Sequence, residues 1–346
     1  MIPANRLDTH ERPPEAIRKL FKKYQKCKAE DLHIDPDVID MSREVNGLGH
    51  QLQPASSQSC FGARDHAFRE FLCYPSDGCG EEKASPVSAF AVTSIPGLYI
   101  LPNLLPHEIQ LALLSNLLHR DLSNPNHQTN VHLHHKISYS LASSNLPIPS
   151  FFNKDQAFIF PPQDPVVHKP INIAEFLGKK LRWMTLGGQY DWTAKRYPPE
   201  TPPPFPADIK QLLKTLLPDL DAQAAIVNVY SPGDTLSIHR DVSESCDQGL
   251  ASISIGCEGV FIVGSQDGTQ AAVIRLRTGD AVYMTGASRY AWHGVPKILP
   301  NTCPDWLAVW PASDNNEKVY NHWRGWMSNK RINLNVRQMY DTLSPI

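Results

Sequence analysis

The stretch NVYSPGDTLSIHRD, residues 228–241, is the part of the sequence that says most about the fold. It predicts a strand, a tight turn and a second strand, because Pro, Gly and Asp cluster between two apolar-alternating runs. Residues two apart in a strand share a face, so His239 and Asp241 should point the same way. An imidazole beside a carboxylate supplies two of the three protein ligands of a non-haem Fe(II) site.

A third ligand is needed, because a chain with 14 histidines contains about one His-x-Asp by chance. His293, in the run YAWHGV, is the candidate. Several predicted strands separate it from Asp241, and a jelly roll pairs strands that are remote in sequence. The alternative is a hydrogen-bonded core histidine. A rival cluster at His132, His134 and His135 has no nearby carboxylate.

The run RINLNVR, residues 331–337, alternates between polar and apolar side chains. Its arginines suit carboxylates because a guanidinium offers fixed pairs of donors. The two arginines lie about 20 Å apart along a strand, so each would lean toward one end of a short diacid such as 2-oxoglutarate. The alternative is an edge strand with a polar outer face. The polar face carries Arg331, Asn333, Asn335 and Arg337, and the apolar face carries Ile332, Leu334 and Val336.

Short alternating runs separated by turn signals continue from residue 225 onward, which predicts an antiparallel sandwich, barrel or jelly roll. Upstream, the patterns predict polar extension or linker over 45–92 and an irregular insertion over 122–170. Helices are expected at 14–30, 106–119 and 205–217, and a short strand at 97–101.

The charge and cysteine content of the chain exclude some classes of function. The net charge of −2 over 346 residues gives no overall basic field, so any nucleic acid contact must be local. Seven cysteines without a CxxC pair argue against a disulfide framework or a cysteine zinc site, and favour a reducing compartment. We expect neither a membrane span nor a secretory signal. The cationic face of helix 14–30 is either solvated or a contact for nucleic acid or a partner.

Taken together, these motifs resemble the AlkB family of 2-oxoglutarate dioxygenases over about residues 96–339. The ordered set is Asn-x-Tyr-x-x-Gly, His-x-Asp, a distant His and Arg-x-Asn-x-x-x-Arg. The runs RKLFKKYQK and PGLYILPN also resemble the first eukaryotic branch of AlkB homologues. The resemblance implies a mainly β fold with helices, namely a double-stranded β-helix (jelly roll, cupin-like) with an N-terminal helical extension. It divides the chain into an extension, 1–92, and a dioxygenase domain, 93–346, with its β-helix core at about 220–340.

The resemblance also implies roles for individual residues. Fe(II) would be bound by the catalytic residues His239, Asp241 and His293. 2-Oxoglutarate, with O2 as the second co-substrate, would be held by Arg331 at its distal carboxylate and by hydrogen bonds from Tyr230 and Asn228. Arg337 and Asn333 would support its metal-bound end.

Three aromatic residues match the family's nucleotide lid: Trp183, Tyr190 and Trp192. Aromatic faces can stack on a flipped base, although ordinary core packing is the alternative. Two positions depart from the pattern. Asn335 stands where the family often has Thr, and Ser243 stands where the bacterial enzyme has an acidic residue that contacts the base, which leaves the target base open.

The resemblance implies that the protein oxidises methyl groups on modified bases, which either removes or hydroxylates the methyl group. The implied substrate is RNA, with tRNA as the leading candidate, or DNA. One alternative applies the same chemistry to a protein side chain such as methyl-lysine of a histone. A second is a non-catalytic 2-oxoglutarate-sensing protein. We expect nucleic acid as the partner, no membrane and no obligate protein partner. The expected compartment is the nucleus, the cytoplasm or both, with the mitochondrion left open.

Overall fold

The computed structural model describes residues 7–43, 51–55, 61–62, 64–73, 86–139, 150–312 and 317–341. The strands are β1 Val38–Asp40, β2 Leu52–Pro54, β3 Phe90–Val92, β4 Leu98–Leu101, β5 Ile159–Phe160, β6 Ile171–Asn172, β7 Trp183–Gly187, β8 Ala224–Tyr230, β9 Leu236–His239, β10 Leu250–Gly256, β11 Gly259–Gly264, β12 Ala271–Leu276, β13 Ala281–Met284, β14 Trp292–Ile298 and β15 Arg331–Arg337. The α-helices are α1 Glu15–Lys26, α2 Ala29–Leu32, α3 Arg64–Phe71, α4 His107–Ser115, α5 Ile173–Glu175, α6 Ala207–Leu216, α7 Asp305–Ala308 and α8 Glu317–Tyr320.

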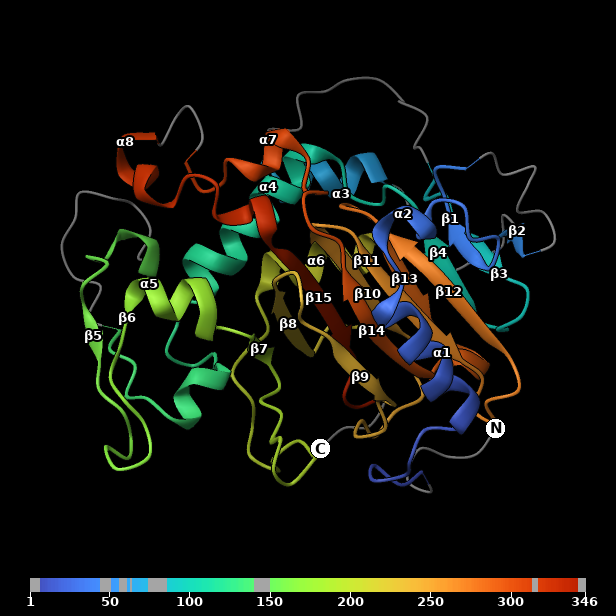
Figure 1. The fold of residues 1–346 in the computed structure, drawn as a ribbon, viewed down its shortest axis with the longest axis horizontal. Coiled ribbons are helices and arrows are strands. Elements are labelled where there is room, and N and C mark those ends of the chain that lie inside the picture. The colour runs from blue at the N-terminus through green and yellow to red at the C-terminus, as the bar shows by residue number, and fades with distance from the viewer. Residues whose placement is uncertain are drawn as a thin grey trace.

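Two sheets make the core (Figure 1). The major sheet has the order β2-β3-β4-β13-β10-β15-β8-β7, and the minor sheet has the order β1-β12-β11-β14-β9. Neighbours such as β10 and β15 are distant in sequence, as a jelly roll requires. Apolar side chains from both sheets fill the space between them, among them Phe261 and Ile274 from the minor sheet and Val282 and Met284 from the major sheet. The predicted double-stranded β-helix is confirmed.

Strand β15 lies in the middle of the major sheet, between β10 and β8. All seven of its residues are buried. Its apolar face, with Ile332, Leu334 and Val336, joins a large core that includes side chains of α4 and α6. The polar face therefore turns toward the inside of the β-helix. The edge-strand alternative is wrong, because both edges of this strand are paired.

Helix α1 covers the outer face of the minor sheet (Figure 1). Its buried Ile17 and Tyr24 pack in one cluster with Val260, Ile262 and Trp292. The predicted helix over 14–30 is observed as α1, and the short α2 follows it. The helix predicted at 106–119 appears as α4 followed by a π-helical turn at 116–121, and the helix predicted at 205–217 appears as α6. The short strand predicted at 97–101 appears as β4.

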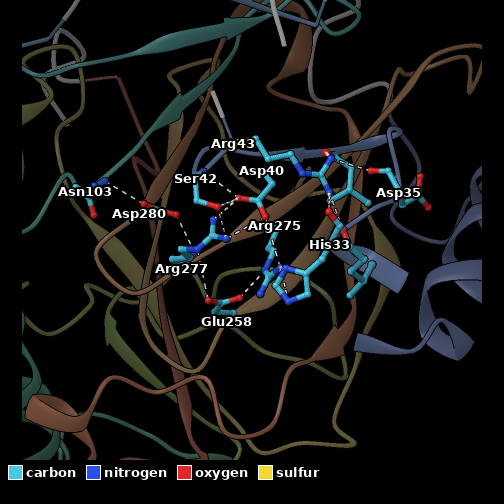
Figure 2. Close-up of polar contacts among 12 residues, drawn as sticks. His33, Asp35, Asp40, Ser42, Arg43, Asn103, Glu258, Arg275, Arg277 and Asp280 are labelled. Carbon is cyan, nitrogen blue, oxygen red and sulfur yellow. Dashed lines mark hydrogen bonds and ion pairs between the residues drawn. The ribbon is translucent and has the colours of Figure 1, made fainter. Parts of the chain in front are cut away.

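Strands that precede residue 93 pair with both sheets. β1 runs parallel to β12, and β2 and β3 extend the major sheet beyond β4. Polar contacts join β1 to the core (Figure 2): Asp40 accepts hydrogen bonds from Arg277 and pairs with Arg275. The division at 92/93 stays a prediction. Much of the polar stretch 45–92 lies outside the described residues, and its described part contains β2, α3 and β3.

The insertion at 122–170 has more structure than its composition predicts. It contains two short 3-10 helices and strand β5, which pairs with β6. Phe151 and Phe160 of the insertion pack edge-to-face with each other and with Phe176, which follows the insertion, with ring centroids 5.2–5.9 Å apart. Residues 140–149 of the insertion lie outside the described part. Among the helices that the structure describes, none has the length and apolar character that a bilayer span needs.

Candidate metal centre and co-substrate pocket

The antiparallel pairing of β9 with β14 brings two distant histidines together. His293 lies directly opposite His239, and their ring centroids are 4.4 Å apart. The next residue, Gly294, allows this approach. A Cβ atom at that position would lie 2.7 Å from the carbonyl oxygen of Leu236 on β9, closer than two such atoms can pack. A glycine after the ligand histidine therefore keeps the two strands in register.

Asp241 completes the group. Its Oδ1 lies 3.7 Å from His239 Nε2, and its Oδ2 lies 3.9 Å from His293 Nε2. One ligand atom from each of the three residues falls within 4.8 Å of the others. Within the described part of the chain, this is the cluster of His, Cys, Asp or Glu whose ligand atoms converge in this way. The arrangement matches a facial triad of two histidines and one carboxylate.

Backbone carbonyls set the tautomers of both histidines. His239 Nδ1 lies 2.9 Å from the carbonyl oxygen of Ser237, and His293 Nδ1 lies 3.0 Å from that of Ala291. A carbonyl can only accept, so each Nδ1 carries the proton and each Nε2 keeps a lone pair for a metal. Burial, followed by the neighbouring His239, lowers the pKa of His293 to about 4, which keeps its ring neutral at pH 7. The buried His293 Nε2 has no hydrogen-bond partner.

The carboxylate of Asp241 is oriented by an arginine. Arg337 donates to Asp241 Oδ2 through Nε at 3.0 Å and Nη2 at 2.6 Å. Burial alone would raise the pKa of Asp241, but Arg337 and the two imidazoles lower it well below its usual value. The ligand is therefore ionised, and its Oδ1 is left for a metal.

Two further charged residues, which the sequence did not single out, lie behind Asp241. Glu244 Oε2 is 2.9 Å from Arg289 Nη2, and Arg289 Nη1 donates to the backbone oxygen of Asp241 at 2.8 Å. Both side chains are buried. The sequence feature that could have identified these two residues is their closeness to the candidate metal-binding residues. Glu244 follows Asp241 by three residues, and Arg289 precedes His293 by four.

A polar pocket beside the metal group lies inside the β-helix. Arg331 is 1% exposed, and only its Nη2 has a partner, Ser254 Oγ at 2.8 Å. Arg331 Nε, Arg331 Nη1 and the buried Tyr230 hydroxyl have no partner, and the two residues face each other across the β15–β8 pair. Burial lowers the pKa of Arg331 and raises that of Tyr230 to about 12. A buried cation with orphan donors beside a neutral hydroxyl fits a carboxylate ligand.

Unlike Arg331 and Tyr230, the other residues predicted to bind 2-oxoglutarate contact each other's strands or already have protein partners. Asn228 lies opposite Asn333 in the β8–β15 pair. Asn333 Nδ2 donates to Ser252 Oγ at 2.8 Å and to the carbonyl of Ile253, and Arg337 is held on Asp241. Contacts of Asn228, Asn333 and Arg337 with 2-oxoglutarate therefore stay predictions. The same pocket is lined by Leu236, Leu250, Ser252, Phe261, Met284, His293, Val295, Arg331, Asn333 and Asn335.

The rival histidines have other partners. His132 Nδ1 accepts from the backbone N–H of Thr129, and its Nε2 lies 2.5 Å from the Tyr139 hydroxyl. His135 Nε2 is hydrogen-bonded to the carbonyl of Lys169, and His134 packs against His168. These rings serve packing and local hydrogen bonds.

The three aromatic residues of the predicted lid form one cluster. Trp183 begins β7, opposite Asn228, and its ring centroid lies 5.2 Å from that of Trp192. Tyr190 lies edge-on to Trp192 at 4.9 Å. Its hydroxyl lies 3.5 Å from Oγ of Ser243, two residues after Asp241. Trp192 is 41% exposed, which a ring buried in ordinary core would not be.

Comparison with known proteins identifies the family. A family profile described as the 2OG-Fe(II) oxygenase superfamily matches residues 97–337. The chain belongs to this superfamily. Fe(II) and 2-oxoglutarate are thus its metal and co-substrate, and the chain is a 2-oxoglutarate-dependent dioxygenase. The residues present fit both groups: His293 Nε2, which has no hydrogen-bond partner, suits the metal, and the donors of Arg331 without partners suit a carboxylate of 2-oxoglutarate.

Relatives within the superfamily match most of the chain. It is 43% identical to the "N6-methyladenosine RNA demethylase ALKB1" of Pyricularia oryzae, over 96% of this chain and 98% of that one. It is 50% identical to the "N6-methyladenosine RNA demethylase ALKBH" of Cryphonectria parasitica, over 61% of this chain and all of that one. It is 38% identical to the "tRNA demethylase abh1" of Schizosaccharomyces pombe, over 72% and 81% of the two chains. The predicted resemblance to the first AlkB homologue branch is confirmed.

Proposed function

We propose that this chain removes the methyl group of a methylated adenine in RNA by oxidation, with N6-methyladenosine as the first substrate to test. Two relatives that share 43% and 50% of their residues with it are named for that activity, and a third is named for tRNA. The alternative substrate is a methylated base in tRNA or DNA.

The observation that carries the proposal is the aromatic cluster next to the metal group. Trp183, Tyr190 and Trp192 lie together, and Tyr190 reaches the segment that follows the ligand Asp241. A base that is flipped out of a strand can stack on such rings, so its methyl group can approach the metal. The aromatic faces recognise a flat base and do not require a strongly basic surface.

The chain's own residues bind, orient and exclude water. His239, Asp241 and His293 would hold the metal, and Arg331 and Tyr230 would hold the distal carboxylate of 2-oxoglutarate inside the β-helix. When bound, the metal and co-substrate supply the oxidising chemistry, and the protein supplies placement. Hydroxylation of an N-methyl group gives a hemiaminal that releases formaldehyde, whereas a hydroxylated C-methyl group is stable. Demethylation thus follows from the atom that carries the methyl group.

Mass spectrometry of nucleosides tests the proposal. The protein is incubated with Fe(II), 2-oxoglutarate and O2 and with an N6-methyladenosine RNA, with tRNA, with methylated DNA or with a methyl-lysine histone peptide. We expect the methylated adenosine of RNA to decline with release of equimolar formaldehyde and at least as much succinate, and His239→Ala to abolish both products. Loss of methyl groups from the peptide alone would reject the nucleic acid assignment, and turnover that survives His239→Ala would reject the enzyme.

The lid has its own prediction. Trp183→Ala and Tyr190→Ala should reduce base oxidation by about tenfold or more, because stacking on one base is worth roughly 1–3 kcal/mol. Succinate formed without nucleic acid should change little, since neither ring contacts the metal ligands. Leu133→Ala, at an exposed apolar residue of the insertion, is the control. Equal losses in both assays would show that the rings serve folding instead.

The compartment belongs to the same proposal. We propose the nucleus, the cytoplasm or both, where RNA substrates occur, and imaging of a tagged full-length chain would test it. Exclusive mitochondrial signal would contradict this assignment.

A further inference from the structure

A closed ring of buried charges lies behind the ligand Asp241. Its side chain accepts from Arg337, whose Nε lies 3.4 Å from Glu244 Oε1. The other oxygen of Glu244 is 2.9 Å from Arg289 Nη2, and Arg289 returns to the backbone oxygen of Asp241 at 2.8 Å. The side chains of Arg337, Glu244 and Arg289 are 4%, 3% and 1% exposed. Two guanidinium groups and two carboxylates thus balance each other in a buried setting.

The ring divides the two oxygens of Asp241 between two tasks. Arg337 donates two hydrogen bonds to Oδ2, which also lies 3.9 Å from His293 Nε2, whereas Oδ1 lies 3.7 Å from His239 Nε2. Glu244 attracts Arg337 from the other side, with Oε1 3.4 Å from Nε, so this guanidinium lies between two carboxylates. Arg289 fixes the position of Glu244 and, through the carbonyls of Asp241 and Gln248, the backbone that carries the ligand.

We propose that Glu244 is a positioning residue for the metal: it keeps Arg337 on Oδ2 of Asp241 so that Oδ1 stays available for coordination. Without its negative charge, two buried guanidinium groups would share one carboxylate. They would then compete with the metal for Asp241, since unpaired buried charges are strongly unfavourable. Residues behind a metal ligand commonly tune affinity in this way. This inference shares with the proposed function the requirement that the triad binds a metal. It does not depend on which substrate the enzyme oxidises.

The test measures metal binding directly, with Mn(II) as the probe, by isothermal titration calorimetry on the full chain without nucleic acid. Glu244→Gln keeps the shape of the side chain and removes its charge. We expect Mn(II) affinity to fall by about 10- to 100-fold. Glu258→Gln is the matched control, because Glu258 also pairs with a buried arginine, Arg275, but within the separate network of Figure 2. The Glu258→Gln variant should bind Mn(II) with the affinity of the parent protein, even if the melting temperature of the variant is lower.

A second variant covers the case in which Glu244→Gln does not fold. Arg289→Lys keeps the charge but cannot contact Glu244, Asp241 and Gln248 together, so it too should weaken Mn(II) binding. Parental affinity in a folded variant, or equal weakening in Glu258→Gln, would overturn the proposal. A parent protein that does not bind Mn(II) would instead contradict the metal site on which the proposed function depends.

Discussion

Arg331 is the residue whose surroundings most directly require an anion. It is a buried cation with two nitrogen atoms that lack partners, and its one hydrogen bond goes to a neutral serine. A folded protein tolerates such a group when a ligand completes it, because an uncompensated buried charge is costly. The neighbouring Tyr230 hydroxyl, also without a partner, extends the same binding surface.

Arg331→Ala should raise the 2-oxoglutarate concentration required for half-maximal succinate formation by about 100-fold or more. The physical reason is the loss of a bidentate charge-assisted contact, each bond of which is worth roughly 1.5–3 kcal/mol. Titration of 2-oxoglutarate at saturating Fe(II) measures the effect, and Mn(II) calorimetry should show that metal binding survives. Arg324→Ala, at an exposed arginine seven residues earlier, is the control. Equal titration curves for Arg331→Ala and the parent would exclude the arginine clamp.

At the scale of elements, residues 7–12 form an N-terminal strap between the metal strand and the lid loop. Leu7 packs against Val242 and Tyr290. Glu11 pairs with Arg240, which lies between two metal ligands in sequence. Lys195 of the lid loop donates to the carbonyl of Thr9, and its Nζ lies 3.1 Å from His10 Nδ1. The strap therefore connects α1 both to the segment around Arg240 and to the loop that carries Lys195.

Loosening the strap should loosen the lid. We expect Leu7→Ala combined with Glu11→Ala to speed amide hydrogen exchange in residues 189–197 by about two- to fivefold, since partly exposed ion pairs contribute roughly 0.2–1 kcal/mol. Hydrogen-exchange mass spectrometry measures this. Lys19→Ala, which removes an exposed ion pair with Glu15 on α1, should leave the loop unchanged. Unaltered exchange in the double variant would show that the lid is held without the strap.

At the scale of the whole molecule, the charged network of Figure 2 joins β1 to the core sheet. Asp40 accepts from both terminal nitrogens of Arg277 and from Ser42. Burial alone would raise the pKa of Asp40, but these partners lower it well below its usual range. A carboxyl group with a lowered folded-state pKa stabilises the fold above its unfolded pKa of about 4 and loses that contribution as the pH falls below it.

Asp40→Asn should therefore destabilise the protein by about 1–2 kcal/mol at pH 7, because Arg277 and the buried Arg275 lose one of their two carboxylate partners and keep only Glu258. The difference from the parent should shrink as the pH falls from 5 to 3. Thermal unfolding followed by circular dichroism at several pH values measures both effects. Asp37→Asn, at an exposed residue nearby, is the comparison. A difference that stays constant from pH 7 to pH 3 would contradict the role of the Asp40 charge.

Local patterns were enough to predict much of the site. The alternation of residues 331–337 is a property of a single strand and appears in the structure as β15. The strand predicted to carry both His239 and Asp241 is shorter than expected, because β9 ends at His239 and Asp241 follows it. Their chemistry is equally local, because imidazole, carboxylate and guanidinium groups have the same ligand preferences in any fold. The resemblance that these motifs carry then indicated the family.

Only tertiary structure decided which face of β15 points inward, that β1, β2 and β3 complete the sheets, and that Glu244 and Arg289 close a ring behind Asp241. The alternation of a strand has the same period whichever face is buried, so it cannot distinguish an interior polar face from a solvent-exposed one. Contacts between residues far apart in sequence depend on strand pairing across the whole chain. Such pairing leaves no periodic signal in either partner alone.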